Sequence, residues 1–317
     1  MRAVRFHEYG GTDVLQVDEI DRPEPAAAEV LVEVHGAGIN PVDTYFREGS
    51  YPPGDLPWIP GSDVAGVVET AGEETDLEAG DRIVATALGN DQQGTCAEYA
   101  VVPEEFAAPL PDSVGFEAAA AGALVGVTAW QSLIAACDIE PGERVLVHGG
   151  NGGVGHLAVQ LAATTGADVT TTASPEYHDR LADLGAETVL DYAREDLEDA
   201  ISEAGEPDAI LDHRLDDYLG LDCRVAGFDA DIAAIGNTDS AATFPNVPAA
   251  RGKALTVHHV SMFNTPDIGS VLERLARLYE RGDIEPVVAE TYDLEGVADA
   301  QVDVLEESVL GKLVVVP

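Results

Sequence analysis

Lysine is nearly absent from this 317-residue chain, which contains only Lys253 and Lys312. Lysine and arginine together number 16 against 59 aspartates and glutamates, which gives a formal net charge of −43. Nucleic-acid affinity comes largely from lysine and arginine, so this charge argues against a protein that binds a phosphate backbone. The acids are spread along the whole chain and do not form an acidic tail.

The excess of negative charge predicts a protein that works in very high salt. In dilute salt such a surface repels itself and destabilises the compact state. At molar salt the Debye length falls to about 3 Å, and the repulsion is largely screened. We therefore expect a halophile with a salt-rich cytoplasm. An ordinary acidic protein from a mesophile is the alternative.

Cysteine is scarce, and no long apolar run is present. Cys96, Cys137 and Cys223 are odd in number and far apart, so they predict neither a disulfide framework nor a CxxC metal site. No uninterrupted apolar stretch reaches about 18 residues, so no membrane-spanning helix and no membrane partner are expected. The first residues soon turn polar, which does not fit a secretory signal. We expect a cytoplasmic protein.

Length and sequence pattern predict two domains. A chain of 317 residues with 45% apolar residues can bury two cores of ordinary size. Residues 1–115 have short apolar runs punctuated by glycine and proline, which is typical of β structure. An Ala-rich helix is predicted from Glu117 to Leu133, and strands and helices then alternate. This alternation predicts an α/β fold with a doubly wound parallel sheet.

The predicted elements follow one another closely. Strands are expected at 144–148, 168–172, 188–190, 209–212 and 232–236. Helices are expected at 154–165, 177–184 and 197–204, and later one amphipathic helix at 268–280 and a final strand at 312–316. We therefore place a Rossmann domain at 116–254, with the first domain formed by 1–115 and completed by 255–317.

A glycine-rich turn joins the first of these strands to the helix after it, and reads Gly149-Gly150-Asn151-Gly152-Gly153-Val154-Gly155. Glycines let the backbone turn tightly and approach a pyrophosphate, and the helix N-terminus offers free N–H groups. A lone glycine cluster usually marks only a turn. Here a strand precedes it and a helix follows, so residues 150–155 predict a dinucleotide site.

The end of the second strand favours NADP(H) over NAD(H). Enzymes that use NAD place a carboxylate there, about 20 residues after the turn, against the ribose 2′-OH. This strand ends at Ser174, which can donate to a 2′-phosphate, and His178 and Arg180 lie one helical turn further on. Glu176 is nearby and favours NAD(H). His178 and Arg180 could instead be solvated residues of a helix surface.

Segments along nearly the whole chain resemble one family in the same order. They are Ala37–Gly49, Ile59–Val68, Gly126–Trp130, the glycine-rich turn, Leu211–His213, Ser261–Asn264 and Gly311–Val314. These segments resemble the zinc-free, zeta-crystallin-like quinone oxidoreductases of the medium-chain dehydrogenase/reductase superfamily. The resemblance implies a GroES-like, β-rich catalytic domain made from both ends of the chain, with the Rossmann domain inserted. We also expect a homodimer or homotetramer.

Zinc alcohol dehydrogenases, which the chain otherwise resembles, differ at the metal ligands. Asn40 stands where they have cysteine, and Gly61-Ser62-Asp63 replaces their Gly-His-Glu. Of the four-cysteine structural zinc lobe only Cys96 is left. Zinc needs three or four N, S or O ligands, so no bound metal is expected. Alcohol oxidation uses such a Lewis acid to lower the hydroxyl pKa, whereas reduction of an electrophilic acceptor does not need it.

The resemblance implies hydride transfer from NADPH to a quinone or to the C=C bond of an activated enone. Asn40, Tyr45 and Thr128 resemble positions that line the nicotinamide and substrate site. Tyr45 could stack on a flat acceptor or donate to an oxygen that gains charge, and a packed structural tyrosine is the alternative. The cofactor-side positions are Asn237, Met262 and Phe263, with Lys312 added although its role is open.

Other functions remain open at this point. After Leu211-Asp212-His213 the family usually has a small residue and two glycines. This chain has Arg214-Leu215-Asp216-Asp217 instead, near the expected cleft, so its substrate range or turnover could differ. His213 could act as an acid or base, or it could be structural. The alternative enzyme is a 2-enoyl-thioester or acrylate-type reductase. The alternative of another class is a nucleotide-binding stress protein with little catalysis.

Overall fold

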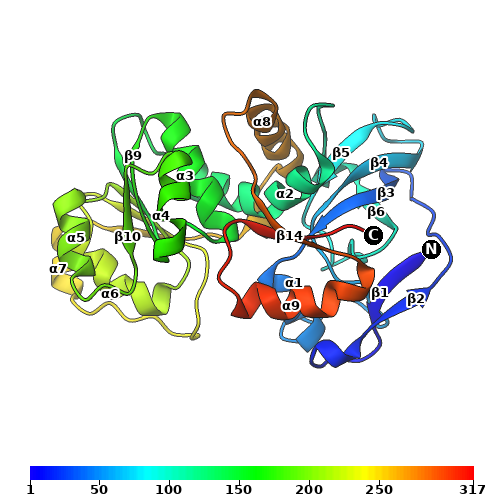
Figure 1. Ribbon diagram of the computed structural model, residues 1–317, viewed down its shortest axis with the longest axis horizontal. Helices are drawn as coiled ribbons and strands as arrows, with labels where there is room; N and C mark the ends of the chain where they lie inside the picture. The colour runs from blue at the N-terminus through cyan, green and yellow to red at the C-terminus, as the bar shows by residue number, and fades with distance from the viewer. The chain divides into compact units, whose positions relative to one another are not determined.

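The computed structural model describes all residues from Met1 to Pro317, and they form two compact units (Figure 1). Unit 1 comprises Met1–Val125, Pro266–Gly282 and Pro286–Pro317, and unit 2 comprises Gly126–Thr265 and Asp283–Glu285. The chain therefore begins in unit 1, builds unit 2 and returns to unit 1. The predicted α/β fold, a parallel sheet inserted into a β-rich domain, is confirmed.

The unit boundaries differ from the predicted ones, which were 116–254 for the inserted domain. At the start, the boundary falls inside helix α2 (Phe116–Trp130), after Val125. At the end, unit 2 continues to Thr265 because it includes strand β13 (Thr256–His259). This strand reads Thr-Val-His-His, which has no apolar run that could predict it.

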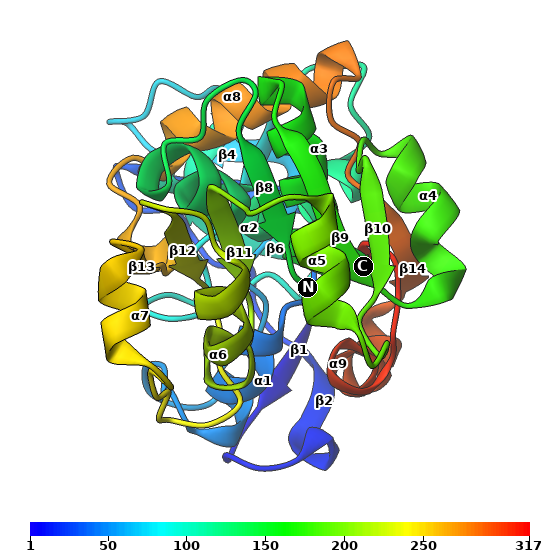
Figure 2. The same ribbon diagram turned by 90° about the vertical axis from the view of Figure 1, so that its left-hand side faces the viewer.

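Unit 2 contains a six-stranded parallel sheet in the order β10-β9-β8-β11-β12-β13 (Figure 2). The other strands are β8 (Arg144–Val147), β9 (Asp168–Ala173), β10 (Thr188–Asp191), β11 (Ala209–Asp212) and β12 (Asp231–Ala234). Numbered from β8, this is the 3-2-1-4-5-6 order of a Rossmann fold. The order reverses between β8 and β11, so ligands are expected outside the carboxyl ends of these strands.

Both faces of this sheet are buried. The core on one face includes Leu146 of β8 together with Ile201 of α5 (Leu197–Ala204) and Leu219 of α6 (Leu215–Val225). Val145 and Val147 point to the opposite face and are equally buried. The further helices of the unit are α3 (Gly153–Thr165), which packs on β8 and β9, α4 (His178–Asp183) and α7 (Val247–Gly252).

Unit 1 contains a seven-stranded sheet in the order β14-β15-β3-β4-β5-β7, with β6 also paired to β3 (Figure 1). Its strands are β3 (Glu29–Gly38), β4 (Val64–Ala71), β5 (Arg82–Ala85), β6 (Tyr99–Pro103), β7 (Ala107–Pro109), β14 (Val288–Tyr292) and β15 (Lys312–Val315). Val314 of β15 pairs with Gly38 of β3, so the two ends of the chain complete one sheet. Its other helices are α1 (Pro41–Glu48), α8 (Ile268–Arg281) and α9 (Val297–Glu306).

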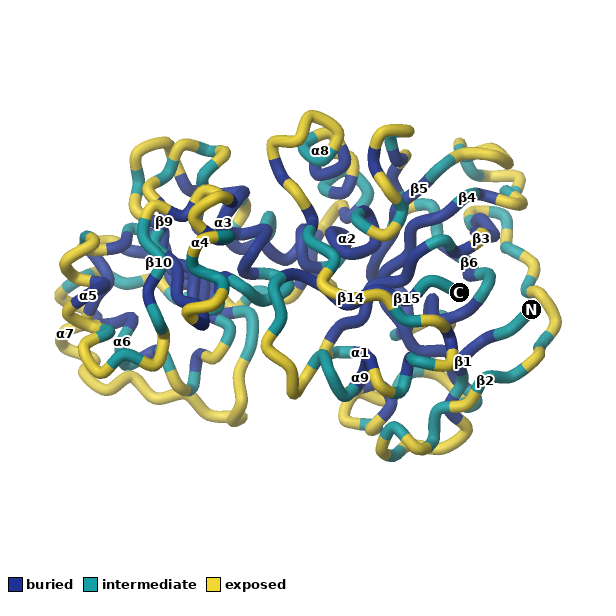
Figure 3. The backbone as a smooth tube through the Cα atoms, in the orientation of Figure 1, coloured by how far each residue is buried: buried dark blue, intermediate teal, exposed yellow.

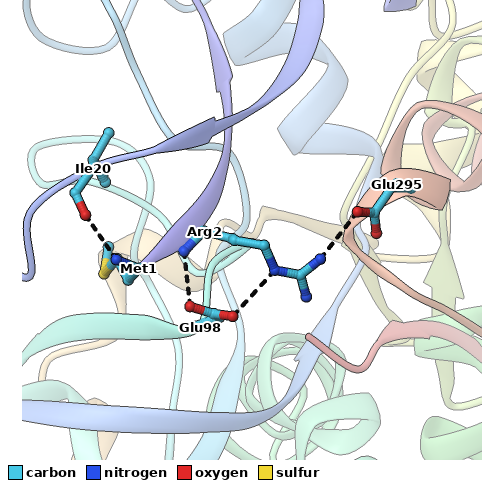
Figure 4. A network of polar contacts seen from close by, with 5 residues as sticks. All are labelled: Met1, Arg2, Ile20, Glu98 and Glu295. Atoms are coloured by element: carbon cyan, nitrogen blue, oxygen red, sulfur yellow. Dashed lines mark hydrogen bonds and ion pairs between the residues drawn. The ribbon is translucent and has the colours of Figure 1, made fainter.

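The N-terminus is anchored by polar contacts at the start of a two-stranded ribbon, β1 (Arg2–Phe6) and β2 (Leu15–Glu19) (Figure 4). The Met1 ammonium group donates to the Ile20 carbonyl at 2.7 Å. The Arg2 guanidinium donates to Glu98 at 3.1 Å and to Glu295 at 3.0 Å. These bonds join the ribbon to segments far along the chain.

One helical stretch, Phe116–Ala136, is long and apolar enough to cross a membrane by length and composition. It consists of α2 and the π-helical segment η3 (Gln131–Ala136). The structure buries 67% of its most apolar window inside the protein, and α2 is largely buried in Figure 3. This environment is that of a core helix.

Candidate active site

The glycine-rich turn follows β8, at the point where the strand order reverses. Gly149 has a φ of +70°, which side chains rarely allow. A Cβ atom on Gly150 would lie 2.1 Å from Thr171 Oγ1, and one on Gly155 would lie 2.1 Å from the Gly149 carbonyl oxygen. These glycines therefore permit the turn and the close packing of α3 against the strand.

Gly152 has a different environment within the same turn. The nearest atom to a Cβ added here is the Gly149 carbonyl oxygen at 3.4 Å, which is an ordinary van der Waals contact, so a methyl group would fit. Gly152 is the N-cap of α3, and no side chain caps this helix. The N–H groups of its first turn are thus available to an anion, next to the positive end of the helix dipole. The predicted set Gly150, Asn151, Gly152, Gly153, Val154 and Gly155 fits a pyrophosphate group.

The end of β9 carries the residues predicted to read a 2′-phosphate. Ser174 follows the strand directly and is buried. Arg180 Nη2 donates to Glu285 Oε2 at 2.7 Å, so its guanidinium is held by a carboxylate of the same unit. His178 Nε2 lies 3.2 Å from the Ala173 carbonyl oxygen, which ties the ring to the strand. A phosphate at this end of the strand would compete with Glu285 for the Arg180 guanidinium.

An exposed tyrosine, Tyr192, lies at the same edge of the sheet and was not named in the sequence analysis. It directly follows β10, and Asp191 pairs with Ala173 in the ladder, so Tyr192 lies level with Ser174. Its side chain is 52% exposed, which is unusual for a large aromatic ring. In the sequence, Tyr192 could have been singled out as an aromatic residue that directly follows a predicted strand.

A buried polar cluster lies beneath the glycine-rich turn. His148, which precedes the turn, pairs through Nε2 with Asp222 Oδ1 at 2.9 Å, and both side chains are fully buried. The His148 ring stacks on Tyr218, with 4.4 Å between ring centroids. Asp212, at the end of β11, is also buried, and the His213 ring lies against Gly149. This cluster supports the turn from the side of β11 and α6.

The protonation of this cluster is set by burial. Burial raises the pKa of Asp212 and of Asp222 to about 7, and each is affected by the other. Burial lowers the pKa of His148 and of His213 to about 4. One oxygen of each aspartate lacks a partner, and a proton held between the two carboxyl groups satisfies both. His213 is neutral at neutral pH, which favours its structural role over that of an acid.

The cluster predicts a pH dependence of stability that Asp222→Asn removes. A buried aspartate whose pKa is raised stabilises the fold at low pH, and this stabilisation is lost as the pH rises through about 7. Relative to the wild type, Asp222→Asn should therefore gain about 2 kcal/mol of unfolding free energy between pH 5 and pH 8. Denaturant unfolding at constant salt measures this difference.

Asp216→Asn is the matched control on the same helix. Thr238 holds the pKa of the exposed Asp216 below its usual value, so this variant should show no such gain at high pH. Parallel pH profiles for the wild type and Asp222→Asn would show that the cluster does not hold the extra proton.

The segment that departs from the family pattern forms the start of α6. Arg214 is its N-cap and pairs with Asp217 at 2.5 Å. The carboxylate of Asp216 accepts from Thr238 N at 2.7 Å, Thr238 Oγ1 at 2.6 Å and Asp239 N at 2.9 Å. It therefore fixes the segment after β12, which includes the predicted cofactor residue Asn237.

The remaining predicted residues of unit 2 differ in exposure. Asn237 is exposed and donates to the Asp239 carbonyl oxygen at 3.1 Å. Met262 is buried, whereas Phe263 is 38% exposed. Thr128 is buried in α2, and its carbonyl oxygen accepts from Ser132 at 2.8 Å. Their roles toward a cofactor remain predictions.

Asn40 lies at the centre of a buried network in unit 1. It is the N-cap of α1 and is 1% exposed. Its Oδ1 accepts from Lys312 Nζ at 2.7 Å, and its Nδ2 donates to Asp63 Oδ2 at 2.8 Å. Both polar groups of this side chain are thus occupied within unit 1. Asn40 can bond a substrate directly only if it gives up one of these bonds.

Two buried carboxyl groups share this network. Asp63 also accepts from Thr86 Oγ1 at 2.6 Å, and Asp43 accepts from Ser62 Oγ at 3.0 Å. Burial raises the pKa of Asp43 to about 7 and raises that of Asp63, while the Lys312 ammonium acts in the opposite direction on both. Asp63 has more donors, so we assign the negative charge to it. The sequence analysis missed both aspartates as members of the site.

Two tyrosines stand at the surface beyond this network. Tyr45, on α1, is 37% exposed, and Tyr51, just after the helix, is 60% exposed. Their ring centroids are 6.1 Å apart with an interplanar angle of 64°. Such a pair offers aromatic surface to a flat ligand. The predicted Tyr45 is thus accessible, and Tyr51 is a neighbour that the sequence analysis did not name.

The side chains at the positions where zinc alcohol dehydrogenases have metal ligands are engaged in hydrogen bonds: Asn40 bonds Asp63, and Ser62 bonds Asp43. Asn40, Ser62 and Asp63 all belong to the buried network with Lys312. No group of three or more His, Cys, Asp or Glu residues is arranged to hold a metal ion.

Comparison with known proteins identifies the family. Residues 26–112 match the alcohol dehydrogenase GroES-like domain, and residues 184–315 match the family described as zinc-binding dehydrogenase. Human quinone oxidoreductase is 32% identical over 99% of this chain and 97% of its own length. The chain belongs to the quinone oxidoreductase family. It is an oxidoreductase of the medium-chain dehydrogenase/reductase superfamily, as the sequence predicted.

Solved structures agree with this assignment. The quinone oxidoreductase of Escherichia coli, solved in complex with NADPH, is 29% identical with a TM-score of 0.89, and the match covers both chains fully. A thermostable alcohol dehydrogenase of Pyrobaculum aerophilum with bound cobalt and zinc is 28% identical with a TM-score of 0.87, over 100% of this chain and 99% of that one. The same backbone is thus found in a protein with bound cobalt and zinc, so the side chains must show whether this chain can hold a metal.

Proposed function

We propose that this protein reduces quinones, or activated enones, by hydride transfer from NADPH without a metal ion. The observation that carries the proposal is the buried network in unit 1, in which Lys312 and Asp63 bond the Asn40 side chain. A side chain used in this way does not bind zinc. The membership of the quinone oxidoreductase family supports the choice of acceptor.

The residues of the chain have separable tasks in this reaction. NADPH supplies the hydride when it is bound. The open N-terminus of α3 at Gly152 binds its pyrophosphate, and the tight packing at Gly150 and Gly155 keeps the turn in shape. Tyr45 and Tyr51 orient the flat acceptor by stacking, and the Tyr45 hydroxyl can donate to an acceptor oxygen that gains negative charge.

The tyrosine pair predicts a defect confined to the acceptor. Tyr51→Ala should raise KM for 9,10-phenanthrenequinone about three- to tenfold, because an aromatic pair contributes about 0.5–1.5 kcal/mol. The dissociation constant of NADPH should not change. Steady-state kinetics and fluorescence titration measure the two quantities. Phe228→Ala, at another exposed aromatic residue, is the control and should change neither. An unchanged KM for Tyr51→Ala would remove the tyrosine pair from the acceptor site.

NADPH preference is proposed from the end of β9, which offers Ser174 and no carboxylate. Arg180→Ala should raise KM for NADPH about tenfold, since a charge-assisted bond to phosphate is worth about 1.5–3 kcal/mol and salt screens part of it. Glu285→Gln should lower KM for NADPH, because it releases Arg180 from its ion pair. Neither change should alter KM for NADH. Equal effects on both cofactors would show that Arg180 does not read the 2′-phosphate.

One assay separates the proposed acceptors. NADPH oxidation is followed in multimolar KCl with 9,10-phenanthrenequinone, then with a crotonyl thioester, and then with neither. We expect turnover with the quinone only. Turnover with the thioester alone would favour the 2-enoyl-thioester reductase, and NADPH binding without turnover would favour the nucleotide-binding stress protein.

We further propose a homodimer or homotetramer in the cytoplasm of a halophile.

A further inference from the structure

One of the two lysines of the chain is buried inside unit 1. Lys312, the first residue of β15, is 4% exposed. Its ammonium group donates to Asn40 Oδ1 at 2.7 Å and also to the Ile39 carbonyl oxygen. Burial lowers its pKa, while Asp63 and Asp43 raise it. Removing a lysine charge from water is costly, so this position requires a compensating arrangement.

The contacts of Lys312 converge on the residues where α1 begins. Strand β3 ends at Gly38 and α1 starts at Pro41, so Ile39 and Asn40 form the junction between them. The Asn40 backbone N–H donates to Asp43 Oδ2 at 2.8 Å, in the first turn of the helix. Lys312 thus holds the junction through one carbonyl and one side-chain oxygen.

Asp63 anchors the same junction from other elements. It accepts from Asn40 Nδ2 at 2.8 Å, from Thr86 Oγ1 at 2.6 Å and from the Leu124 backbone N–H at 2.9 Å. The Asn40 amide group therefore lies between a cation that bonds its oxygen and an anion that bonds its nitrogen. This arrangement allows only one orientation of the amide.

Helix α1 carries the aromatic surface described above. Tyr45 lies within the helix, and Tyr51 follows it, with its backbone N–H bonded to the Tyr45 carbonyl oxygen at 3.3 Å. The place of both rings depends on where α1 begins and in which direction it runs. The hydrogen bonds of the Lys312 ammonium group lie within unit 1, whereas the glycine-rich turn belongs to unit 2.

We propose that Lys312 is a positioning residue for the electron acceptor, because it fixes the start of α1 and thereby the tyrosines that hold the acceptor. The inference rests on the proposed quinone reduction. It assigns to Lys312 a task on the acceptor side, whereas the sequence resemblance placed this lysine among the cofactor residues.

The test uses Lys312→Met, which keeps the length of the side chain, combined with Asp63→Asn. The single Lys312→Met variant leaves the Asp63 charge buried and unpaired, and it is expected to lose stability. The double variant removes both charges and should fold. It lacks the lysine donors that hold Ile39 and Asn40 and also one carboxylate oxygen of Asp63, which accepts from Asn40. Its defects are therefore compared with those of Asp63→Asn alone, and the difference reports on the lysine donors.

Two readouts are measured on the double variant in multimolar KCl. We expect kcat/KM for 9,10-phenanthrenequinone to fall at least tenfold, while the dissociation constant of NADPH stays within about twofold of the wild-type value. We also expect hydrogen exchange of the amides of residues 42–51 to accelerate at least tenfold, with exchange in α3 unchanged. Lys253→Met is the matched control, because Lys253 also bonds two carbonyl oxygens, those of Arg224 and Ala226, and should alter neither readout.

The outcomes separate this inference from the proposed function. Wild-type exchange at residues 42–51 in the double variant would overturn the role of Lys312, as would wild-type kcat/KM for the quinone. An equal loss of NADPH affinity and quinone turnover would also overturn it, because the effect would then be global. A wild-type protein that reduces no quinone would contradict the proposed function alone, and the exchange measurement would still test whether Lys312 fixes α1.

Discussion

Transferred from multimolar KCl into about 0.1 M salt, the protein is expected to lose its folded structure. The chain has 16 basic and 59 acidic residues, so 43 acids would lack a basic partner even if every basic residue formed one ion pair. At least ten arginines already form ion pairs with these acids. The Debye length rises from about 3 Å at 1 M to about 10 Å at 0.1 M salt, and the unpaired acids then repel one another.

Circular dichroism and thermal unfolding across a KCl series measure this effect. The folded signal should be lost below a threshold salt concentration and should return when KCl is restored. An equimolar series in a neutral osmolyte is the control, because it changes hydration without screening charge. A thermal midpoint that is the same at 0.1 M and at 3 M KCl would contradict the halophilic interpretation of the charge.

The glycine-rich turn predicts two different defects from one added methyl group. Gly155→Ala places a Cβ atom 2.1 Å from the Gly149 carbonyl oxygen, so it should destabilise unit 2 and abolish NADPH binding. Gly152→Ala meets its nearest atom only at 3.4 Å, so the fold should be kept. Its methyl group would stand at the helix N-terminus, where the pyrophosphate is proposed to bind, and NADPH affinity should fall at least a hundredfold.

Thermal unfolding and NADPH fluorescence titration distinguish the two variants. Gly252→Ala is the matched control in unit 2, because no atom lies within 4 Å of its added Cβ and its φ is not positive. It should keep both stability and affinity. If Gly152→Ala bound NADPH like the wild type, the cofactor would not sit on the N-terminus of α3.

The sequence predicted the parallel sheet well because its strands are buried on both faces. Such strands are short apolar runs, and β8, β11 and β12 have this character. Strands β9 and β10 were predicted from the β-branched residues valine and threonine. Strand β13 was missed because it lies at the sheet edge and is polar. Helix α6 was also missed, although the two acids of its first turn, Asp216 and Asp217, favour a helix start.

The site was predicted less completely than the fold. The glycine-rich turn could be found because strand, turn and helix are adjacent in the sequence. The buried network could not be predicted, because Asn40, Asp63 and Lys312 are brought together only by the pairing of β3 with β15 and with β4. A lysine near the end of a chain looks like a surface charge until its burial is known. Arg180 was predicted to bind a phosphate, but its ion pair with Glu285 was not predicted, because Glu285 is more than a hundred residues away in the sequence.

The most direct test of the proposed function is a stoichiometric turnover on metal-depleted protein. The protein is dialysed against a chelator in 3 M KCl, its metal content is determined, and one equivalent of NADPH is mixed with 9,10-phenanthrenequinone under anaerobic conditions. We predict that one NADPH is oxidised for each quinone reduced, at the rate of the untreated protein and with less than 0.1 metal ion per chain. Loss of turnover on chelation, restored by one equivalent of zinc, would contradict metal-free hydride transfer.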